Sequence, residues 1–132
     1  MSAYEILCAA GLAGVLAAAV WTLVKVRVTG SAALAAALSA AFAGFSAVTI
    51  YREGVVQVWT NHTLNLWGVQ VWWDLLFATG TALYFITPRA RAAGMALLPW
   101  YAFVMATASI GLLAMAARLF WLEEKAGAAE AA

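Results

Sequence analysis

The aspartate Asp74 holds the position that most strongly suggests chemistry, because it lies just inside a long apolar run and directly follows Trp72 and Trp73. An ionised aspartate about 10 Å inside hydrocarbon costs several kcal/mol unless it is paired or hydrated. On a helix, Gln70 lies one turn before Asp74 on the same face, and Trp67 lies one turn further back. Aromatic faces beside a carboxylic acid can stabilise a cation, as enzymes that protonate an isoprenoid double bond require.

Two interpretations of Asp74 are open. The first makes it a catalytic acid or a ligand anchor beside a set of ligand-binding residues: Trp67, Gln70, Trp72, Trp73, Arg52 and His62. The second makes it a structural ion pair with Arg52 that joins two helix ends. Asp74→Asn separates the two, since losing a structural pair lowers stability whereas losing a proton donor lowers activity alone. Tryptophan belts at the two membrane surfaces account for most of the aromatic residues without any function.

No metal site or familiar cofactor site is expected. His62 is the only histidine and cannot supply both axial ligands of a haem, and Cys8 is the only cysteine. No cluster of Cys, His and carboxylate residues has metal-ligand spacing, and no phosphate loop or catalytic triad pattern is present. The cofactor therefore stays unknown, with a bound lipid or isoprenoid as the open class. A net charge of +1 offers no field for nucleic acid.

The surroundings of these residues indicate a bilayer. Hydrophobic residues make up 67% of the 132 residues and charged residues only 10%, against about 25% in a typical soluble domain. A 13.9 kDa chain cannot hide so much apolar surface from water. The sequence predicts an all-α integral membrane bundle of four transmembrane helices in one domain, residues 1–125. We expect spans at about 5–25, 31–51, 67–87 and 94–118, an interfacial loop or short amphipathic helix at 52–66, and a flexible tail at 126–132.

Particular residues predict how these helices begin, end and meet. Ser31 is the expected N-cap of the second span, and Pro88 is expected to stop the third. Pro99 belongs either to the first turn of the last span or to a kink in a longer one. Helices in lipid associate through small residues. The second helix is expected to pack on the first through a four-residue ladder: Ala32, Ala36, Ala40 and Gly44.

The distribution of Lys and Arg predicts the orientation. The first and third connections carry four of them: Lys25, Arg27, Arg89 and Arg91. The opposite side carries three: Arg52, Arg118 and Lys125. Because cytoplasmic loops carry an excess of Lys and Arg, loops 25–30 and 88–93 are expected in the cytoplasm and both termini outside.

Four short stretches support a resemblance: WWDLL at 72–76, PRARAAGM at 88–95, PWY at 99–101 and SIGL at 109–112. With these, residues 32–124 resemble a family of short bacterial multi-span membrane proteins with no assigned function. More distantly, the aromatic-Asp span, the Arg-rich turn and the Gly-Leu-Leu at 111–113 are similar to neoxanthin-synthase-like membrane proteins of carotenoid metabolism. The first resemblance implies a bacterial inner membrane, and the second nominates Asp74.

Three functions are compatible with these observations. The favoured hypothesis is a non-catalytic subunit, or a protein that binds lipid or a hydrophobic cofactor, within a larger membrane complex. The alternative is a membrane-embedded enzyme of the cyclase or isomerase type, with Asp74 as acid in a Trp-lined pocket. A small transporter is the third. The expected partners are membrane lipids and a larger membrane complex or further copies of this chain.

Overall fold

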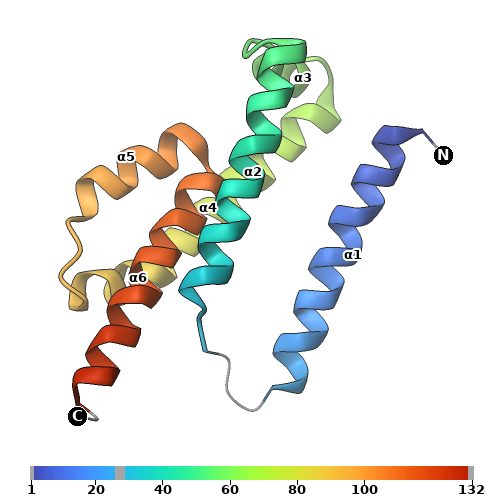
Figure 1. Cartoon of the computed structure of the whole chain (residues 1–132). Coiled ribbons are helices and arrows are strands. Elements are labelled where there is room, and N and C mark those ends of the chain that lie inside the picture. The colour runs from blue at the N-terminus through green and yellow to red at the C-terminus, as the bar shows by residue number, and fades with distance from the viewer. Residues whose placement is uncertain (1, 26–28, 131–132) are drawn as a thin grey trace. The chain divides into compact units, whose positions relative to one another are not determined.

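The computed structural model describes residues 2–25 and 29–130, and every regular element there is an α-helix. The all-α expectation is thus confirmed. Contacts divide the chain into two units, Met1–Gly30 and Ser31–Ala132. The helices are α1 (Ala3–Val24) in the first unit and, in the second, α2 (Ala32–Glu53), α3 (Gln57–Thr63), α4 (Leu66–Ala92), α5 (Leu97–Thr107) and α6 (Ser109–Glu130) (Figure 1).

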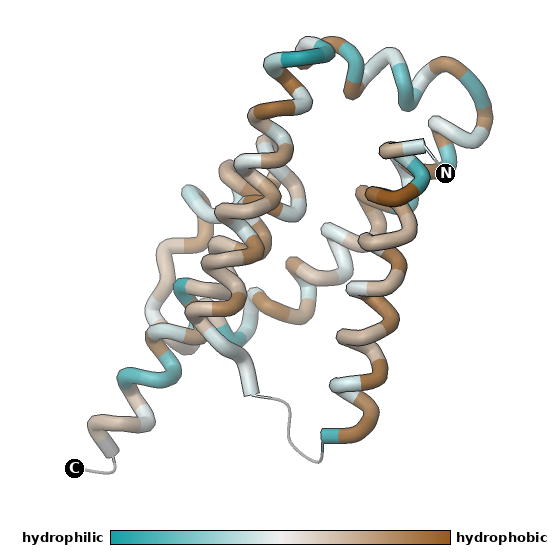
Figure 2. Tube along the Cα trace, turned by 45° about the vertical axis from the view of Figure 1, so that its right-hand side comes forward, coloured by the Kyte–Doolittle hydropathy of each residue, from teal (hydrophilic) through white to brown (hydrophobic). Residues whose placement is uncertain are grey.

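Three of these helices, α1, α2 and α4, are long and apolar enough to cross a membrane. At 1.5 Å per residue, the 22-residue helices α1 and α2 are about 33 Å long, which matches a hydrocarbon core of about 30 Å. The three helices α1, α2 and α4 correspond to the first three spans expected from the sequence. Figure 2 shows apolar residues along the whole of α1, while polar residues gather in the connection that contains α3.

The start of α1 is defined by two polar side chains that replace missing backbone partners. The hydroxyl of Ser2 accepts from the Glu5 backbone N–H at 3.2 Å, and the Glu5 carboxylate accepts from the Ser2 backbone N–H at 2.6 Å. This capping box satisfies two N–H groups that a helix otherwise leaves open. Ser31 caps α2, as expected, through a single bond in which its hydroxyl accepts from Leu34 N at 3.2 Å.

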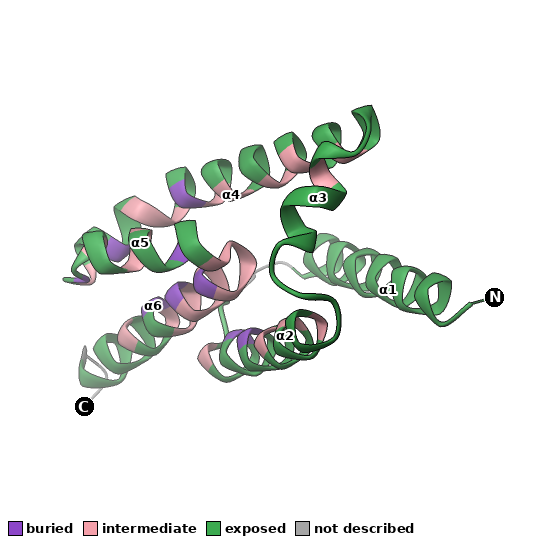
Figure 3. Cartoon of the chain, turned by 90° about the horizontal axis from the view of Figure 1, so that it is seen from above, coloured by how far each residue is buried: buried purple, intermediate pink, exposed green. Residues whose placement is uncertain are grey.

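The core of the second unit lies where the C-terminal half of α4 meets α5 and α6 (Figure 3). Val104, Met115 and Leu119 are its largest fully buried side chains. Across one edge of this core, Thr87 and Tyr101 share a hydrogen bond of 2.6 Å between their hydroxyls. The six buried members are Leu83, Ala90, Met95, Val104, Met115 and Leu119.

The segment expected as one fourth span is divided into α5 and α6 at Ala108, whose φ of 48° ends the first helix. Gly111 then lets the two helices approach closely, because a Cβ there would lie 2.8 Å from the Phe103 backbone. The fourth expected span is therefore not a continuous helix. Pro99 lies in the first turn of α5, and α6 continues to Glu130 through most of the tail that was expected to be flexible.

The end of α4 also differs from expectation, since the helix continues past Pro88 to Ala92. A proline removes one N–H near the end of a helix, and few turns remain to be disturbed there. The chain leaves the helix through a turn at Gly94, whose φ of 74° is the left-handed conformation that glycine adopts without strain. Gly94 N bonds to Arg91 O and Met95 N to Ala90 O, both at 3.0 Å, which is the Schellman pattern.

The second unit packs α2 against α6, with Ala35 and Ser39 buried at the contact. This contact uses a different face of α2 from the expected ladder, because Ala36, Ala40 and Gly44 are exposed; the packing of that ladder on the first helix stays a prediction. A strict four-residue step turns about 40° around a helix each time, so such a ladder winds away from a straight contact face. Alternating steps of three and four, as from Ala32 to Ala35 and Ser39, stay on it.

Ala35→Leu should therefore disrupt the second unit, whereas Ala40→Leu should leave it intact. Overpacking a tight helix contact costs about 1–3 kcal/mol, and the exposed position has room for the larger side chain. Thermal unfolding in mild detergent, followed by circular dichroism, measures both variants. A lower midpoint for Ala40→Leu than for Ala35→Leu would contradict the contact through the Ala35–Ser39 face.

Candidate functional site

The candidate site lies on the N-terminal half of α4, which α3 covers on one side. Asn65 caps α4 by accepting from Gly68 N at 2.9 Å. Gly68 is required for the fold-back of α3, because a Cβ at this position would overlap the backbone carbonyl oxygen of Asn61. The sequence therefore builds a tight turn in which a polar connection closes onto the first turn of an apolar helix.

An aromatic cluster holds α3 on α4. The rings of Trp59 and Trp72 lie 6.4 Å apart edge to face, and the ring of His62 lies 5.2 Å from Trp72. His62 Nδ1 is hydrogen-bonded to the Val58 carbonyl, so Nδ1 carries the proton and Nε2 is left as an acceptor in the neutral ring. The structure thus brings two predicted ligand-binding residues, His62 and Trp72, together.

Asp74 points away from this fold. It is exposed, and Leu83, nine residues later, is buried in the core. Nine residues at about 100° each amount to two and a half turns, so Asp74 lies on the face of α4 opposite the core. Among the side chains that the structure describes, the one ion pair joins Arg89 and Glu123, and the Asp74 carboxylate takes part in no hydrogen bond.

The predicted pair between Asp74 and Arg52 is thus not formed in the structure. Arg52 lies in the last turn of α2, and α2 packs along α6. The helix α4 reaches α5 and α6 through its C-terminal half, so its N-terminal half is not held beside α2. The sequence indicates that Arg52 and Asp74 lie near the ends of their helices, but it does not indicate whether these two helices pack side by side.

Trp67 and Gln70 share the exposed face of Asp74. Together with Leu66 they line a shallow open hollow on the first turns of α4. Trp73 lies on a neighbouring part of the helix surface, 5.4 Å from the ring of Phe77, and both rings are more than half exposed. Four of the six predicted ligand-binding residues therefore form two groups, His62 and Trp72 against α3 and Trp67 and Gln70 beside Asp74, while Trp73 and Arg52 join neither.

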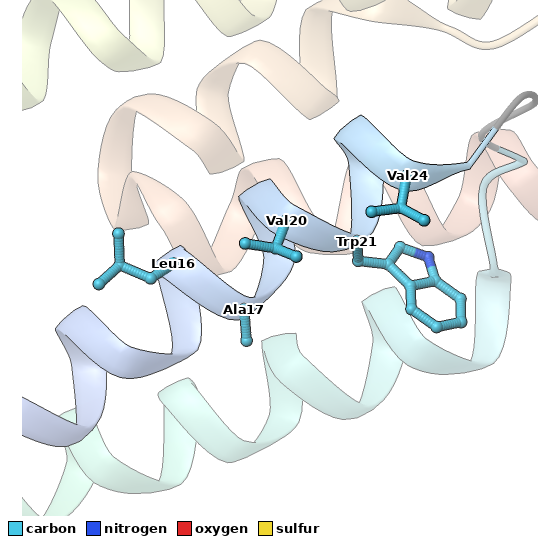
Figure 4. A pocket seen from close by; sticks show the side chains of 5 residues that line it. All are labelled: Leu16, Ala17, Val20, Trp21 and Val24. Carbon is cyan, nitrogen blue, oxygen red and sulfur yellow. The ribbon is translucent and has the colours of Figure 1, made fainter.

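The first unit presents a second shallow surface. The five side chains of Figure 4 come from two successive turns of α1 and form an open apolar strip: Leu16, Ala17, Val20, Trp21 and Val24. At its end, the Lys25 ammonium lies 4.5 Å from the Trp21 ring centroid, a cation–π distance. A strip of this kind suits an acyl chain or another helix, and none of its apolar members can transfer a proton.

Sequence analysis missed the polar contacts of α6. Ser39 Oγ donates to the Ile110 carbonyl at 2.9 Å, and the Glu123 carboxylate accepts two bonds from Arg89. The adjacent acids Glu123 and Glu124, set against the basic turn at Arg89 and Arg91, were the available signal. These acids can pair with the basic turn only if α6 lies beside α4. A continuous fourth span would instead have carried the acids to the other side of the membrane.

The chemistry available at the site is that of a single carboxylate on an apolar helix surface. Asp74 can accept hydrogen bonds or pair with a cation, and Gln70 one turn away can both donate and accept. In the part of the chain that the structure describes, no three His, Cys, Asp or Glu residues form a group able to hold a metal ion.

Comparisons with family models, curated proteins and solved structures give no match. The resemblance to short bacterial membrane proteins, and the more distant one to neoxanthin-synthase-like proteins, therefore stay predictions.

Gly68→Ala should break the packing of α3 on α4, because its methyl group would overlap the Asn61 carbonyl oxygen. The expected readout is a loss of near-ultraviolet circular dichroism from the Trp59–Trp72 pair, with the helix content almost unchanged. Gly80→Ala is the matched control, since a Cβ there meets nothing within 4 Å and alanine favours a helix by about 1 kcal/mol. Equal spectra for the two variants would contradict the described turn.

Proposed function

We propose that this chain is a small integral membrane protein that serves as a non-catalytic subunit of a larger membrane complex. It binds through the exposed face of α4 that carries Trp67, Gln70, Asp74 and Phe77. The partner is a transmembrane helix with a cation or hydrogen-bond donor at the depth of Asp74. One observation carries the proposal: the carboxylate lies on the outer side of a helix apolar enough to cross a membrane.

The position of Asp74 along α4 makes a partner necessary. Asp74 lies eight residues after Leu66, about 12 Å along the helix axis. A lysine or arginine can extend its side chain over much of such a distance to reach water, but an aspartate cannot. A carboxylate held against lipid costs about 2.5–3.5 kcal/mol by insertion scales, and a donor from a second protein offsets that cost.

The residues around Asp74 have the composition of a protein contact. Trp67 is 76% exposed and Phe77 is 65% exposed, so large aromatic surfaces flank the carboxylate. Aromatic side chains are enriched at the centres of protein interfaces, and polar side chains hydrogen-bond between helices in membranes. Gln70 adds a second polar group one turn away, which sets the register of a partner helix.

The membrane assignment combines the structure with the sequence. We assign α1, α2 and α4 as membrane spans, and the bacterial inner membrane as the membrane that the resemblance implies. The fourth span expected from the sequence has no single helix to correspond to it, since residues 97–130 are divided at Ala108.

An enzyme that uses Asp74 as acid is the second candidate, and one observation favours it. The hollow formed by Leu66, Trp67 and Gln70 adjoins Asp74, and a flat apolar ligand could rest on the Trp67 indole there. This hollow is open, and Trp72 faces α3 instead of Asp74. A closed pocket would need walls from outside the second unit, so even this alternative calls for a partner surface at the same face of α4.

Asp74→Asn should weaken the complex by about 5- to 30-fold, because losing a charge-assisted bond between helices costs about 1–2 kcal/mol. A photo-crosslinking residue at Thr81, which is exposed two turns along the same face, reports the contact in native membranes. Leu38 on α2 is the control position. The expected result is one product of defined mass from Thr81, strongly reduced in Asp74→Asn, and none from Leu38.

Equal crosslinking from both positions, or a product that Asp74→Asn leaves unchanged, would contradict the proposal. A product with the mass of two chains would replace the larger complex with a homo-oligomer. Purification of an uncrosslinked chain that carries an isoprenoid, with turnover abolished by Asp74→Asn, would establish the enzyme instead.

A further inference from the structure

Glu123 and Glu124 of α6 lie at the same end of the second unit as the C-terminus of α4 and the N-terminus of α2. Arg89 Nε donates to Glu123 Oε1 at 3.0 Å, and Arg89 Nη2 donates to Glu123 Oε2 at 2.7 Å. Glu124 Oε1 accepts from the backbone N–H of Ala32 at 3.3 Å. Two adjacent acids of α6 thus bind the end of α4 and the start of α2.

The opposite end of α6 lies partway along α2. The bond from Ser39 to the Ile110 carbonyl places the first turn of α6 beside a residue seven positions after Ala32. Seven residues correspond to about 10 Å along a helix of about 33 Å. The break between α5 and α6 therefore lies far from the end of α2 at Glu53 (Figure 1).

The break between α5 and α6 suits apolar surroundings, because a side chain at the break caps the helix that follows it. Thr107 Oγ1 donates to Phe103 O at 2.7 Å and accepts from Gly111 N at 3.0 Å. The Ser39 hydroxyl donates to Ile110 O, which connects α2 to the first turn of α6, and Gly111 is buried. Non-helical backbone at membrane depth is tolerated only where protein groups or water satisfy it.

We propose that α5 and α6 form a re-entrant hairpin that enters and leaves the bilayer on one side, and that this side is a cytoplasmic face that binds anionic phospholipid headgroups. The proposal rests on the membrane location assigned above but not on a partner for Asp74. In this topology α6 returns toward the end of α4 and does not cross the membrane.

This topology changes the distribution of positive charge. Arg89 and the start of α2 share one side through Glu123 and Glu124, and α6 brings Arg118 and Lys125 to that side. Lys25 and Arg27 belong by sequence to the connection that leads into α2, although residue 27 is outside the described residues. Of the seven Lys and Arg residues, only Arg52 is then on the other side.

The even distribution expected for four spans thus becomes a strong bias, and the rule of positive cytoplasmic loops assigns the charged side to the cytoplasm. The N-terminus is then outside and the C-terminus inside. Loops 25–30 and 88–93 keep their expected side, while Arg118 and Lys125 move to it.

Three cations on this face are free to bind lipid. Glu123 and Glu124 are engaged by Arg89 and Ala32, whereas Arg91, Arg118 and Lys125 are exposed and have no carboxylate partner in the described chain. The ring centroid of Trp121 lies 4.4 Å from the Arg118 guanidinium and 3.9 Å from the Lys125 ammonium. A tryptophan flanked by two cations is an interfacial anchor beside which an anionic headgroup can bind.

Cysteine accessibility tests the topology. In a Cys8→Ala background, single cysteines are placed at Thr60, Ala92 and Ala126, all exposed in the structure. A membrane-impermeant maleimide added to intact bacterial cells should label Thr60→Cys only, and should label the other two only after the cells are opened. Labelling of Thr60→Cys and Ala126→Cys together, without Ala92→Cys, would establish four spans and overturn the hairpin.

Labelling of Ala92→Cys and Ala126→Cys without Thr60→Cys would keep the hairpin but overturn the cytoplasmic assignment. A chain that does not sediment with the membranes would refute the proposed function itself, so the two failures are distinguishable.

Native mass spectrometry from detergent tests the lipid site, with phosphatidylglycerol and phosphatidylcholine as probes. The preference for phosphatidylglycerol should fall by about ten-fold or more in the triple variant Arg91→Gln, Arg118→Gln, Lys125→Gln, since each cation near an anionic surface contributes about five-fold. Arg52→Gln is the control and should keep the preference. An equal loss in Arg52→Gln, or no preference in the native chain, would overturn the proposal.

Two further measurements keep this test decisive. Inorganic phosphate at millimolar concentration should not displace the lipid, and displacement would show a free-anion site instead. If the triple variant does not fold, the salt dependence of the native chain decides: the preference should weaken at about 0.5 M salt, where exposed charges are screened. A preference unchanged by salt would refute a headgroup site.

Discussion

The hydrogen bonds around the break at Ala108 are the constraint on which the arrangement of the second unit depends. Residues 92–117 carry no charge, so a continuous apolar helix is the simplest structure for them. The break is stabilised because Thr107 Oγ1 caps α6 by accepting from Gly111 N, and because Ser39 on α2 donates to Ile110 O in the first turn of α6. Gly111 removes the Cβ that would otherwise separate α5 from α6. Once the chain turns there, Glu123 and Glu124 reach Arg89 and the N-terminus of α2, and the charged end forms.

The parts of this fold that sequence predicts are those determined within a single helix. Long uncharged runs predict α1, α2 and α4, and Ser31 predicts the start of α2, because length, hydropathy and capping are local properties. The break at Ala108 escaped prediction because no proline marks it, and its supporting bond comes from Ser39, about seventy residues away. The same holds for Pro88, whose effect depended on a Schellman turn six residues later.

In the candidate site too, the sequence predicts what one helix determines and not what the packing of helices determines. Helical periodicity correctly grouped Trp67, Gln70 and Asp74 on one exposed face, since that grouping needs only the pitch of a helix. It could not say which side of α4 meets the core, because that depends on Leu83 and Ala90 packing against α5 and α6. The Trp-lined pocket expected around Asp74 is therefore incomplete, because Trp72 lies against α3 and contacts His62 and Trp59.

The carboxylates of the second unit are satisfied unequally, and this difference gives Asp74 its significance. Glu123 and Glu124 bind groups of their own chain, and they lie at an end of the unit where charges are common. Asp74 lies among apolar residues on a helix that can cross a membrane, where an unpaired carboxylate costs more, yet no described residue of its unit donates to it. The second unit supplies hydrogen-bond partners to Glu123 and Glu124, but it supplies none to Asp74 among its described residues. That Asp74 instead faces away from every packed helix of its unit argues that its donor belongs to another molecule.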